Sequence, residues 1–90
     1  MRIEYQKNYI YIKDQDQGVG YIRFNYKDDQ VIDVLTTYVN DEYRGQGIAG
    51  KLFAELVSFC RKQHLQILPS CSYIKNKLEN SHEYDDIYVK

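Results

Sequence analysis

The spacing of apolar residues changes once along this chain, near residue 40, and that change limits the folds it can adopt. Before this point apolar and polar residues alternate, so that Ile22, Phe24 and Tyr26 fall on one side of an extended segment. From Gly47 to about Gln63 the apolar residues instead recur at the helical spacing i, i+3, i+4 and i+7, at Ile48, Ala49, Leu52, Phe53, Leu56, Val57 and Cys60. The sequence therefore predicts strands followed by one long amphipathic helix.

Polar turns separate the predicted strands. Residues 14–18 and 27–30 are polar turn segments, and they divide stretches that are rich in β-branched and aromatic residues. These stretches lie around Ile3 and Tyr5 and at residues 9–13, 19–26 and 31–39. Short polar turns between alternating runs indicate an antiparallel meander.

A short apolar stretch, Gln66–Pro69, follows the long helix and is predicted to be a buried strand that ends at Pro69, which cannot donate to a ladder. A strand, a helix and a further strand predict a βαβ crossover, in which this strand runs parallel to residues 31–39 or to their neighbour.

The rest of the chain predicts one more helix. Ser70, Cys71 and Ser72 can cap a short helix over residues 72–80. The tail, residues 81–90, is polar and aromatic and is expected to be partly ordered. The fold class is therefore α+β, with an N-terminal antiparallel meander, a βαβ crossover around the long central helix and a short C-terminal helix, in a single domain that spans residues 1–90.

Length and composition exclude several classes of protein. Ninety residues, 43% of them hydrophobic, build one modest core. The net charge of −1 argues against a nucleic-acid partner, although ten tyrosines can either stack on bases or form a half-buried strand surface. No apolar stretch approaches the roughly 18 residues that span a bilayer, and the N-terminus does not resemble a signal peptide. We therefore expect no membrane association and a cytoplasmic location.

The cysteines and histidines give no pattern of metal ligands. Cys60 and Cys71 are expected to be free thiols, as is usual in a reducing compartment. His64 and His82 lie far apart in the sequence and lack a Cys-x-x-Cys partner, so no metal site is predicted.

The segment between the last meander strand and the long helix has the composition of a phosphate-binding loop. It reads Arg44-Gly45-Gln46-Gly47-Ile48-Ala49-Gly50-Lys51. The first N–H groups of a helix have no internal partner and carry partial positive charge, so they can bind a pyrophosphate. Gly45 and Gly47 allow backbone angles closed to other residues, and Arg44 and Lys51 add positive charge at the rim.

Two glycines before a helix can also make only a tight turn. The loop is not a dinucleotide fingerprint, because no third glycine follows Gly45 and Gly47 at the required position. It is not a P-loop either, because the four-residue gap and the Gly-Lys-Ser/Thr ending are absent. Spacing alone leaves phosphate binding and a structural turn both open.

The loop resembles a known signature. Arg44-Gly45-Gln46-Gly47-Ile48-Ala49 is similar to the Gln/Arg-x-x-Gly-x-Gly/Ala motif of the GCN5-related N-acetyltransferases (GNAT). The order of the loop, Pro69-Ser70-Cys71-Ser72-Tyr73 and the tail Glu83-Tyr84-Asp85-Asp86-Ile87 also resembles a compact single-domain GNAT-like family with a Pro-x-Cys-x-Tyr motif. The resemblance covers nearly the whole chain.

The resemblance implies acetyl-CoA or coenzyme A as cofactor. By that resemblance the loop amides hold the pyrophosphate, and the backbone of Thr37, Tyr38 and Val39 offers hydrogen bonds to the pantetheine arm. The expected cofactor-binding residues are Thr37, Tyr38, Val39, Arg44, Gly45, Gln46, Gly47, Ile48, Ala49, Gly50 and Lys51. The implied activity moves an acetyl group to an amine, on a small molecule or a peptide.

Cys71 is the candidate catalytic residue. It lies at the start of a predicted helix, where the dipole lowers the pKa of a thiol, and a thiolate there can take the acetyl group or act as a base. A small thiol packed under the cofactor is the alternative. The compact family carries its candidate cysteine here, but this chain has Thr36, Ser81 and His82 where relatives have His, His and Pro, which removes any proton relay through those histidines.

The remaining residues leave three functions open. The first is an acetyltransferase, the second a GNAT-like module that binds CoA or acyl-CoA without catalysis, and the third an interaction domain that uses the tyrosine-rich strands. Cys60 is expected in the core, and His64 at the end of the long helix. We expect a monomer, and the sequence leaves a dimer open.

Overall fold

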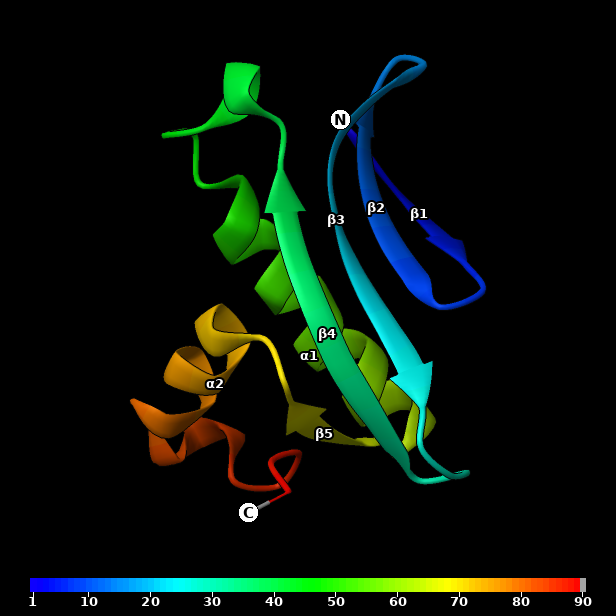
Figure 1. The fold of residues 1–90 in the computed structure, drawn as a ribbon, viewed down its shortest axis with the longest axis vertical. Coiled ribbons are helices and arrows are strands. Elements are labelled where there is room, and N and C mark those ends of the chain that lie inside the picture. Colours follow the sequence, from blue (N-terminus) through cyan, green and yellow to red (C-terminus); the bar gives the residue numbers. More distant parts are fainter. Residues whose placement is uncertain (90) are drawn as a thin grey trace.

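The computed structural model describes residues 1–89 as a five-stranded sheet with two helices (Figure 1). In chain order the elements are β1 (Arg2–Gln6), β2 (Tyr9–Asp14), β3 (Gln17–Tyr26), β4 (Val31–Val39), the short 3₁₀ helix η1 (Asp41–Tyr43), α1 (Ile48–Gln63), β5 (Gln66–Pro69), α2 (Ser72–Glu79) and a second 3₁₀ helix, η2 (His82–Tyr84). The predicted meander, crossover and short second helix are confirmed.

The strands pair in sequence order, β1-β2-β3-β4-β5. The first three pairs are antiparallel, as the polar turns predicted, and β5 pairs parallel to β4 with Ile32 opposite Ile67. Pro69 pairs with Val34 at the end of β5, where the missing N–H stops the ladder. The predicted parallel crossover is therefore correct, and β5 joins the strand formed by residues 31–39.

A register shift divides β4 into two halves. Phe24 of β3 pairs with Val34, but the preceding residue, Arg23, pairs with Thr36, so Leu35 is an extra residue on β4. Below the shift Val34 points to the core. Above it Thr37 is opposite the buried Ile22, and directly opposite residues share a face.

Both helices lie on the same side of the sheet. α1 packs against β2, β3 and β4, and a Cβ added to Gly20 would meet Ile48 and Leu52 at 3.3 Å. The segment after α2 returns to α1, where the rings of Phe53 and Tyr84 lie 5.0 Å apart. In Figure 1 α1 lies behind the sheet, and no helix crosses the near face. Among the described residues the other face of the sheet therefore has no covering layer.

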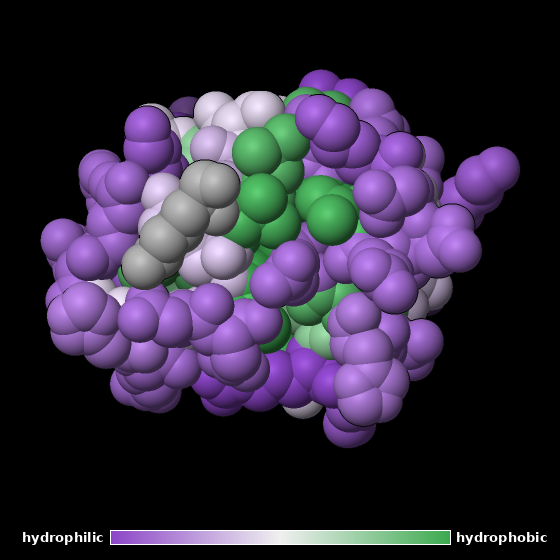
Figure 2. All heavy atoms as spheres, turned by 90° about the horizontal axis from the view of Figure 1, so that it is seen from below, coloured by the Kyte–Doolittle hydropathy of each residue, from purple (hydrophilic) through white to green (hydrophobic). Residues whose placement is uncertain are grey.

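One hydrophobic core fills the space between the sheet and the helices. It takes residues from every element between β2 and α2 except η1, and its last member is Ile87. Cys60 is fully buried in it, as the helical spacing predicted. Figure 2 views the molecule from below with respect to Figure 1. On this face, apolar atoms lie in the middle and polar side chains surround them. In the part that the structure describes, neither helix combines the length and the apolar character needed to cross a bilayer.

The tail is more ordered than the sequence indicated. Arg61 of α1 forms an ion pair with Asp86 at 3.1 Å and donates to the backbone oxygen of Glu83 at 2.8 Å. Ile87 is 2% exposed, and the N–H of Ile67 donates to its carbonyl. The tail thus packs on β5 and closes the lower end of the core.

The helix ends follow the predicted chemistry in part. α1 begins after Gly47, which has a left-handed backbone with φ 76°, and ends at His64, whose N–H donates to the oxygen of Cys60. At α2 the N-cap residue is Cys71, one of the three residues expected there, but its side chain forms no capping hydrogen bond. The first N–H groups of the short helix therefore lie beside the thiol.

The close approach of α1 to the sheet predicts the effect of one substitution. A Cβ at position 20 would lie 2.7 Å from the carbonyl oxygen of Tyr38, which is backbone and cannot move aside cheaply. We expect Gly20→Ala to lower the free energy of unfolding by about 1–3 kcal/mol, measured by urea denaturation.

Gly18→Ala is the matched control in the same strand. A Cβ at position 18 would meet nothing within 4 Å, so this variant should stay within about 0.5 kcal/mol of the parent protein. Equal stability of the two variants would contradict the tight contact.

Candidate functional site

The loop between η1 and α1 has the backbone that a bound anion requires. Gly45 and Gly47 have φ angles of 82° and 76°, a left-handed region that side chains disfavour. A Cβ built at either position, or at Gly50, would meet no atom within 4 Å. The glycines therefore leave open space in front of the loop rather than filling a packed turn.

The N–H groups of this loop are available. Within the described residues no hydrogen bond occupies the backbone N–H groups of residues 45–50, and the first internal bond runs from Lys51 to the oxygen of Gly47 at 3.1 Å. α1 also has no acidic residue in its first turn. Several free donors at the positive end of a 16-residue helix form a site suited to a phosphate group.

The loop opens onto a cleft of about 340 Å³. The cleft lies between the end of β4, the start of α1 and the start of α2. Its lining residues are Thr37, Val39, Tyr43, Arg44, Gly45, Gly47, Ile48, Ala49 and Tyr73. Seven of these were expected to bind a cofactor on the basis of the sequence, and they come from three separate elements.

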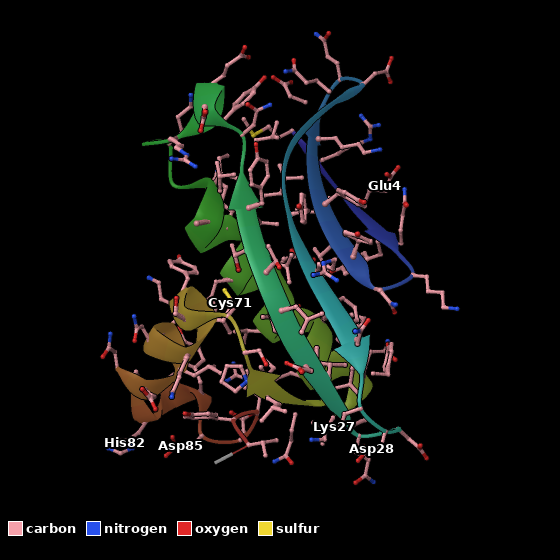
Figure 3. The ribbon with its side chains drawn as sticks, in the orientation of Figure 1. Glu4, Lys27, Asp28, Cys71, His82 and Asp85 are labelled. Carbon is pink, nitrogen blue, oxygen red and sulfur yellow. The ribbon has the colours of Figure 1, made fainter. Side chains whose placement is uncertain are left out.

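A gap between β4 and α2 continues the cleft into the sheet. Pairing of β4 with β5 stops at Val34 and Pro69, and the last backbone contact is the bond from the N–H of Cys71 to the oxygen of Val34 at 2.9 Å. Beyond this point Thr37 lies on one side and Cys71 with Tyr73 on the other. Figure 3 shows Cys71 between β4 and the start of α2.

The surroundings of Cys71 favour its thiolate. Burial raises the pKa of this thiol, but hydrogen bonds with the Thr37 side chain and with the backbone at Ile74, Tyr73 and Thr37 lower it, and the net pKa lies below the ordinary value. The Sγ atom is 3.5 Å from Oγ1 of Thr37. Cys60, by contrast, lies in the apolar core, where burial raises its pKa to about 12.

Some of the expected residues lie outside the cleft lining. The ring of Tyr38 lies 5.3 Å from that of Tyr21 on the uncovered face, and Lys51 borders a different hollow near the N-terminus. Gln46 and Gly50 belong to the loop but are absent from the lining set. The roles of these four residues in cofactor binding stay predictions. For Tyr38 the prediction concerns its backbone groups, and for Gln46, Gly50 and Lys51 it concerns their position in or beside the loop.

Two tyrosines of the cleft escaped the sequence analysis as binding residues. Tyr43 ends η1, and its hydroxyl lies 3.3 Å from a carboxylate oxygen of Asp14. Tyr73 entered the sequence analysis only as the last residue of the motif around Cys71. Its position directly after the cysteine motif was the available signal.

The histidines lie far from this site. His82 and Asp85 are at the opposite end of α2 from Cys71 (Figure 3), and His64 caps the far end of α1. Asp33, in contrast, lies near the gap, because its Oδ1 accepts a 2.6 Å hydrogen bond from the hydroxyl of Ser70. The lining residues of the cleft include no carboxylate and no imidazole.

Comparison with a family model shows to which protein family the chain belongs. The model described as "GCN5-related N-acetyl-transferase" matches residues 8–87. This chain belongs to that family. The match spans the loop, the cleft and Cys71, so the GNAT resemblance read from the sequence is confirmed at the level of the family. The narrower assignment to a compact group with a Pro-x-Cys-x-Tyr motif stays a prediction.

Solved structures agree with the GNAT assignment. A GCN5-like protein from Staphylococcus aureus, solved by NMR, is 34% identical, with a TM-score of 0.78 over 98% of this chain and 87% of its own. Ard1 from Thermoplasma volcanium is 15% identical, with a TM-score of 0.65 over 89% of this chain and 64% of its own, and shows the fold alone. No curated protein gave a match.

The contrast between the two thiols predicts their reactivity. Because its pKa is lowered, Cys71 should react with iodoacetamide with a midpoint at lower pH than a cysteine in a short unstructured peptide measured alongside. Mass spectrometry after alkylation between pH 6 and pH 10 measures both thiols in one sample. Cys60 is the internal control and should stay unmodified until the protein unfolds.

Thr37→Val removes the side-chain hydrogen bond to Cys71 and should move its alkylation midpoint to higher pH. A Cys71 midpoint at or above that of free cysteine in the parent protein would contradict the assigned environment.

Proposed function

We propose that this protein is an acetyl-CoA-dependent acetyltransferase that moves an acetyl group to an amine. The observation that carries the proposal is the row of unoccupied N–H groups at residues 45–50, which opens into a cleft that leads to the Cys71 thiol. A diphosphate bound at one end and a thioester at the other match the chemistry of this arrangement.

Structural neighbours support the choice of cofactor. The GNAT protein YhbS from Escherichia coli, solved with CoA, is 24% identical, with a TM-score of 0.59 over 68% of this chain and 38% of its own. A GNAT protein from Elizabethkingia anophelis with acetyl-CoA bound is 14% identical, with a TM-score of 0.63 over 80% of this chain and 50% of its own. Since this chain spans half or less of these two proteins, acetyl-CoA enters as part of the proposal.

Each part of the cleft has a role in the proposed reaction. The amides of residues 45–50 hold the pyrophosphate, with Arg44 at the rim, and the exposed backbone of residues 37–39 orients the pantetheine arm. When bound, acetyl-CoA supplies an activated acetyl thioester. Tyr43 and Tyr73 narrow the cleft and exclude water from the thioester.

Cys71 can serve in two ways that balance chemically. As a nucleophile, its thiolate bonds to the acetyl carbon while the bond to the CoA sulfur breaks, and the amine then displaces Sγ. As a base, Sγ takes the proton that the amine loses when the new C–N bond forms, and CoA leaves as the thiol. In both cases the lowered pKa of Cys71 raises the fraction of the reactive form at neutral pH.

One observation favours a second function, that of a non-catalytic CoA-binding module. No carboxylate or imidazole lines the described cleft, so the nearby Cys71 is its one candidate base. If the Cys71 thiol is inactive, the protein can bind CoA but has no base at this cleft. In either function we expect a single domain that spans residues 1–90. Two free thiols are in keeping with the proposed cytoplasmic location.

Cofactor binding is tested at the loop. Gly47→Ala places a Cβ on a left-handed residue, so the N–H groups leave their present positions. We expect the Kd for CoA, measured by calorimetry, to rise at least tenfold, and the amide signals of residues 45–50 of the parent protein to shift on titration. Gly18→Ala, in open space on β3, should bind CoA like the parent. Absence of heat and of shifts at millimolar CoA would end the proposal.

Catalysis is tested at the thiol. Release of CoA from acetyl-CoA is measured with a panel of amines for the parent protein, Cys71→Ala and Cys71→Ser. We expect kcat to fall by about 10²–10⁴-fold in Cys71→Ala while the Kd for CoA stays unchanged. An acetyl group found on Cys71 by mass spectrometry would favour the covalent route. Equal turnover in the two variants and the parent would remove Cys71 from the mechanism.

A further inference from the structure

A side-chain hydrogen bond helps to tie the link between β5 and α2 to the neighbouring strand β4. The pair of Val34 and Pro69 is the last of the ladder, because Pro69 has no N–H. Directly after it, the hydroxyl of Ser70 donates to Oδ1 of Asp33 at 2.6 Å. One residue later, the N–H of Cys71 donates to the carbonyl of Val34 at 2.9 Å. Two consecutive residues of the link are therefore fixed to two consecutive residues of β4.

The bond between Ser70 and Asp33 lies on the opposite side of β4 from the thiol. Asp33 precedes the buried Val34, so alternation turns its side chain to the uncovered face of the sheet. The Cys71 sulfur instead lies 3.5 Å from Oγ1 of Thr37, which lines the cleft. The link is therefore held from the uncovered face, and the cleft beside the thiol stays open.

The position of the start of α2 depends on the chain that enters this helix. α2 is eight residues long, it buries Ile74 and Leu78 alone, and its N-cap residue, Cys71, forms no capping hydrogen bond through its side chain. A helix this short is marginal by itself, so its place is set by packing and by the residues that precede it. The residue that enters α2 ahead of the cap is Ser70, which the bond to Asp33 holds against β4.

The hydrogen-bond partners of the Cys71 thiolate belong to two different elements. The backbone at Tyr73 and Ile74 is part of α2, whereas Thr37 is part of β4. Hydrogen bonds weaken steeply as their distance and angle depart from the favoured range. A movement of α2 away from β4 would lengthen the contact between Sγ and Oγ1 of Thr37. The two sets of partners therefore act together on the thiol only while the start of α2 is held against β4.

We propose that Asp33 and Ser70 are positioning residues for Cys71, and that their hydrogen bond holds the thiol between β4 and the first turn of α2. The inference rests on the proposed role of Cys71 in acetyl transfer and adds two residues to that role. Neither Asp33 nor Ser70 lines the cofactor cleft. The pair acts through the backbone of residues 69–71, which it fixes beside the last ladder pair.

The charge of Asp33 and its hydrogen bond have opposite effects on the thiol, which allows them to be separated. A nearby negative charge disfavours a thiolate, so loss of the charge alone would lower the pKa of Cys71. Loss of the positioning bond would instead raise this pKa. Asp33→Asn removes the charge but keeps an oxygen that accepts from Ser70, whereas Asp33→Ala removes both. The direction of the change in Asp33→Ala therefore shows which effect is larger.

The test measures the pH midpoint of Cys71 alkylation by iodoacetamide in the absence of cofactor. We expect Ser70→Ala and Asp33→Ala each to move the midpoint to higher pH by about 0.5 units, a roughly threefold change in the thiolate equilibrium. The double variant should move it no further, because both changes remove the same bond. Asp33→Asn and Ser70→Thr, which keep the acceptor and the donor, should not raise the midpoint. In turnover with acetyl-CoA, kcat of the alanine variants at neutral pH should fall about threefold, with an unchanged Kd for CoA.

Ser72→Ala is the matched control on the other side of Cys71. The Ser72 side chain is exposed and forms no hydrogen bond with any described residue, so this variant should keep the parent midpoint. Protection of the buried Cys60 shows that each variant is folded. An unchanged midpoint in Ser70→Ala, an equal shift in Ser72→Ala or a downward shift in Asp33→Ala would overturn the positioning role. Failure of the loop amides to respond to CoA would instead overturn the proposed function and leave these midpoints as expected.

Discussion

The parallel pairing of β4 with β5, and its early end, sets the geometry of everything near the site. Four residue pairs join the strands, and the last is Val34 with Pro69, whose missing N–H cannot continue the ladder. The chain then turns into α2 and leaves the upper half of β4 without a neighbour on that side. The cleft, the thiol and the open backbone of residues 37–39 all occupy the space created there. The N-terminal end of α1, with its free N–H groups, also lies at this space. The crossover that closes the core therefore also brings hydrogen-bond donors to the cleft.

The sequence predicted the parts of the fold that depend on local patterns. Alternation and helical spacing predicted the meander, α1 and the crossover, and Gly45 and Gly47 indicated the loop because glycine allows backbone angles closed to other residues. It could not show the register shift at Leu35. Strict alternation from Val34 would turn Tyr38 toward the helices, whereas the extra residue turns Thr37 and Val39 that way. The contact between Thr37 and Cys71 joins residues 34 positions apart, so the local sequence pattern around either residue does not predict it.

The two cysteines show how position decides the character of one side chain. Cys60 is fully buried, and burial raises its pKa because a charged thiolate there would lose its hydration. Cys71 is partly buried as well, but it begins a helix, so nearby N–H groups and the Thr37 hydroxyl compensate the charge. The absence of a side-chain cap on α2, which the sequence did not foresee, therefore leaves these donors to the thiolate.

The way in which the tail meets β5 has a consequence for self-association. Ile67 donates to the carbonyl of Ile87, and Val89 donates to that of Ile67, so the backbone of residues 87–89 occupies the outer rim of β5 as a short extra partner. A foreign strand cannot add to the sheet there. At the opposite end of the sheet, β1 is also an edge strand, and Arg2 and Glu4 place opposite charges along it, which disfavours pairing with an apolar strand. The borders of the sheet at β5 and β1 thus carry features that disfavour edge-to-edge pairing between molecules.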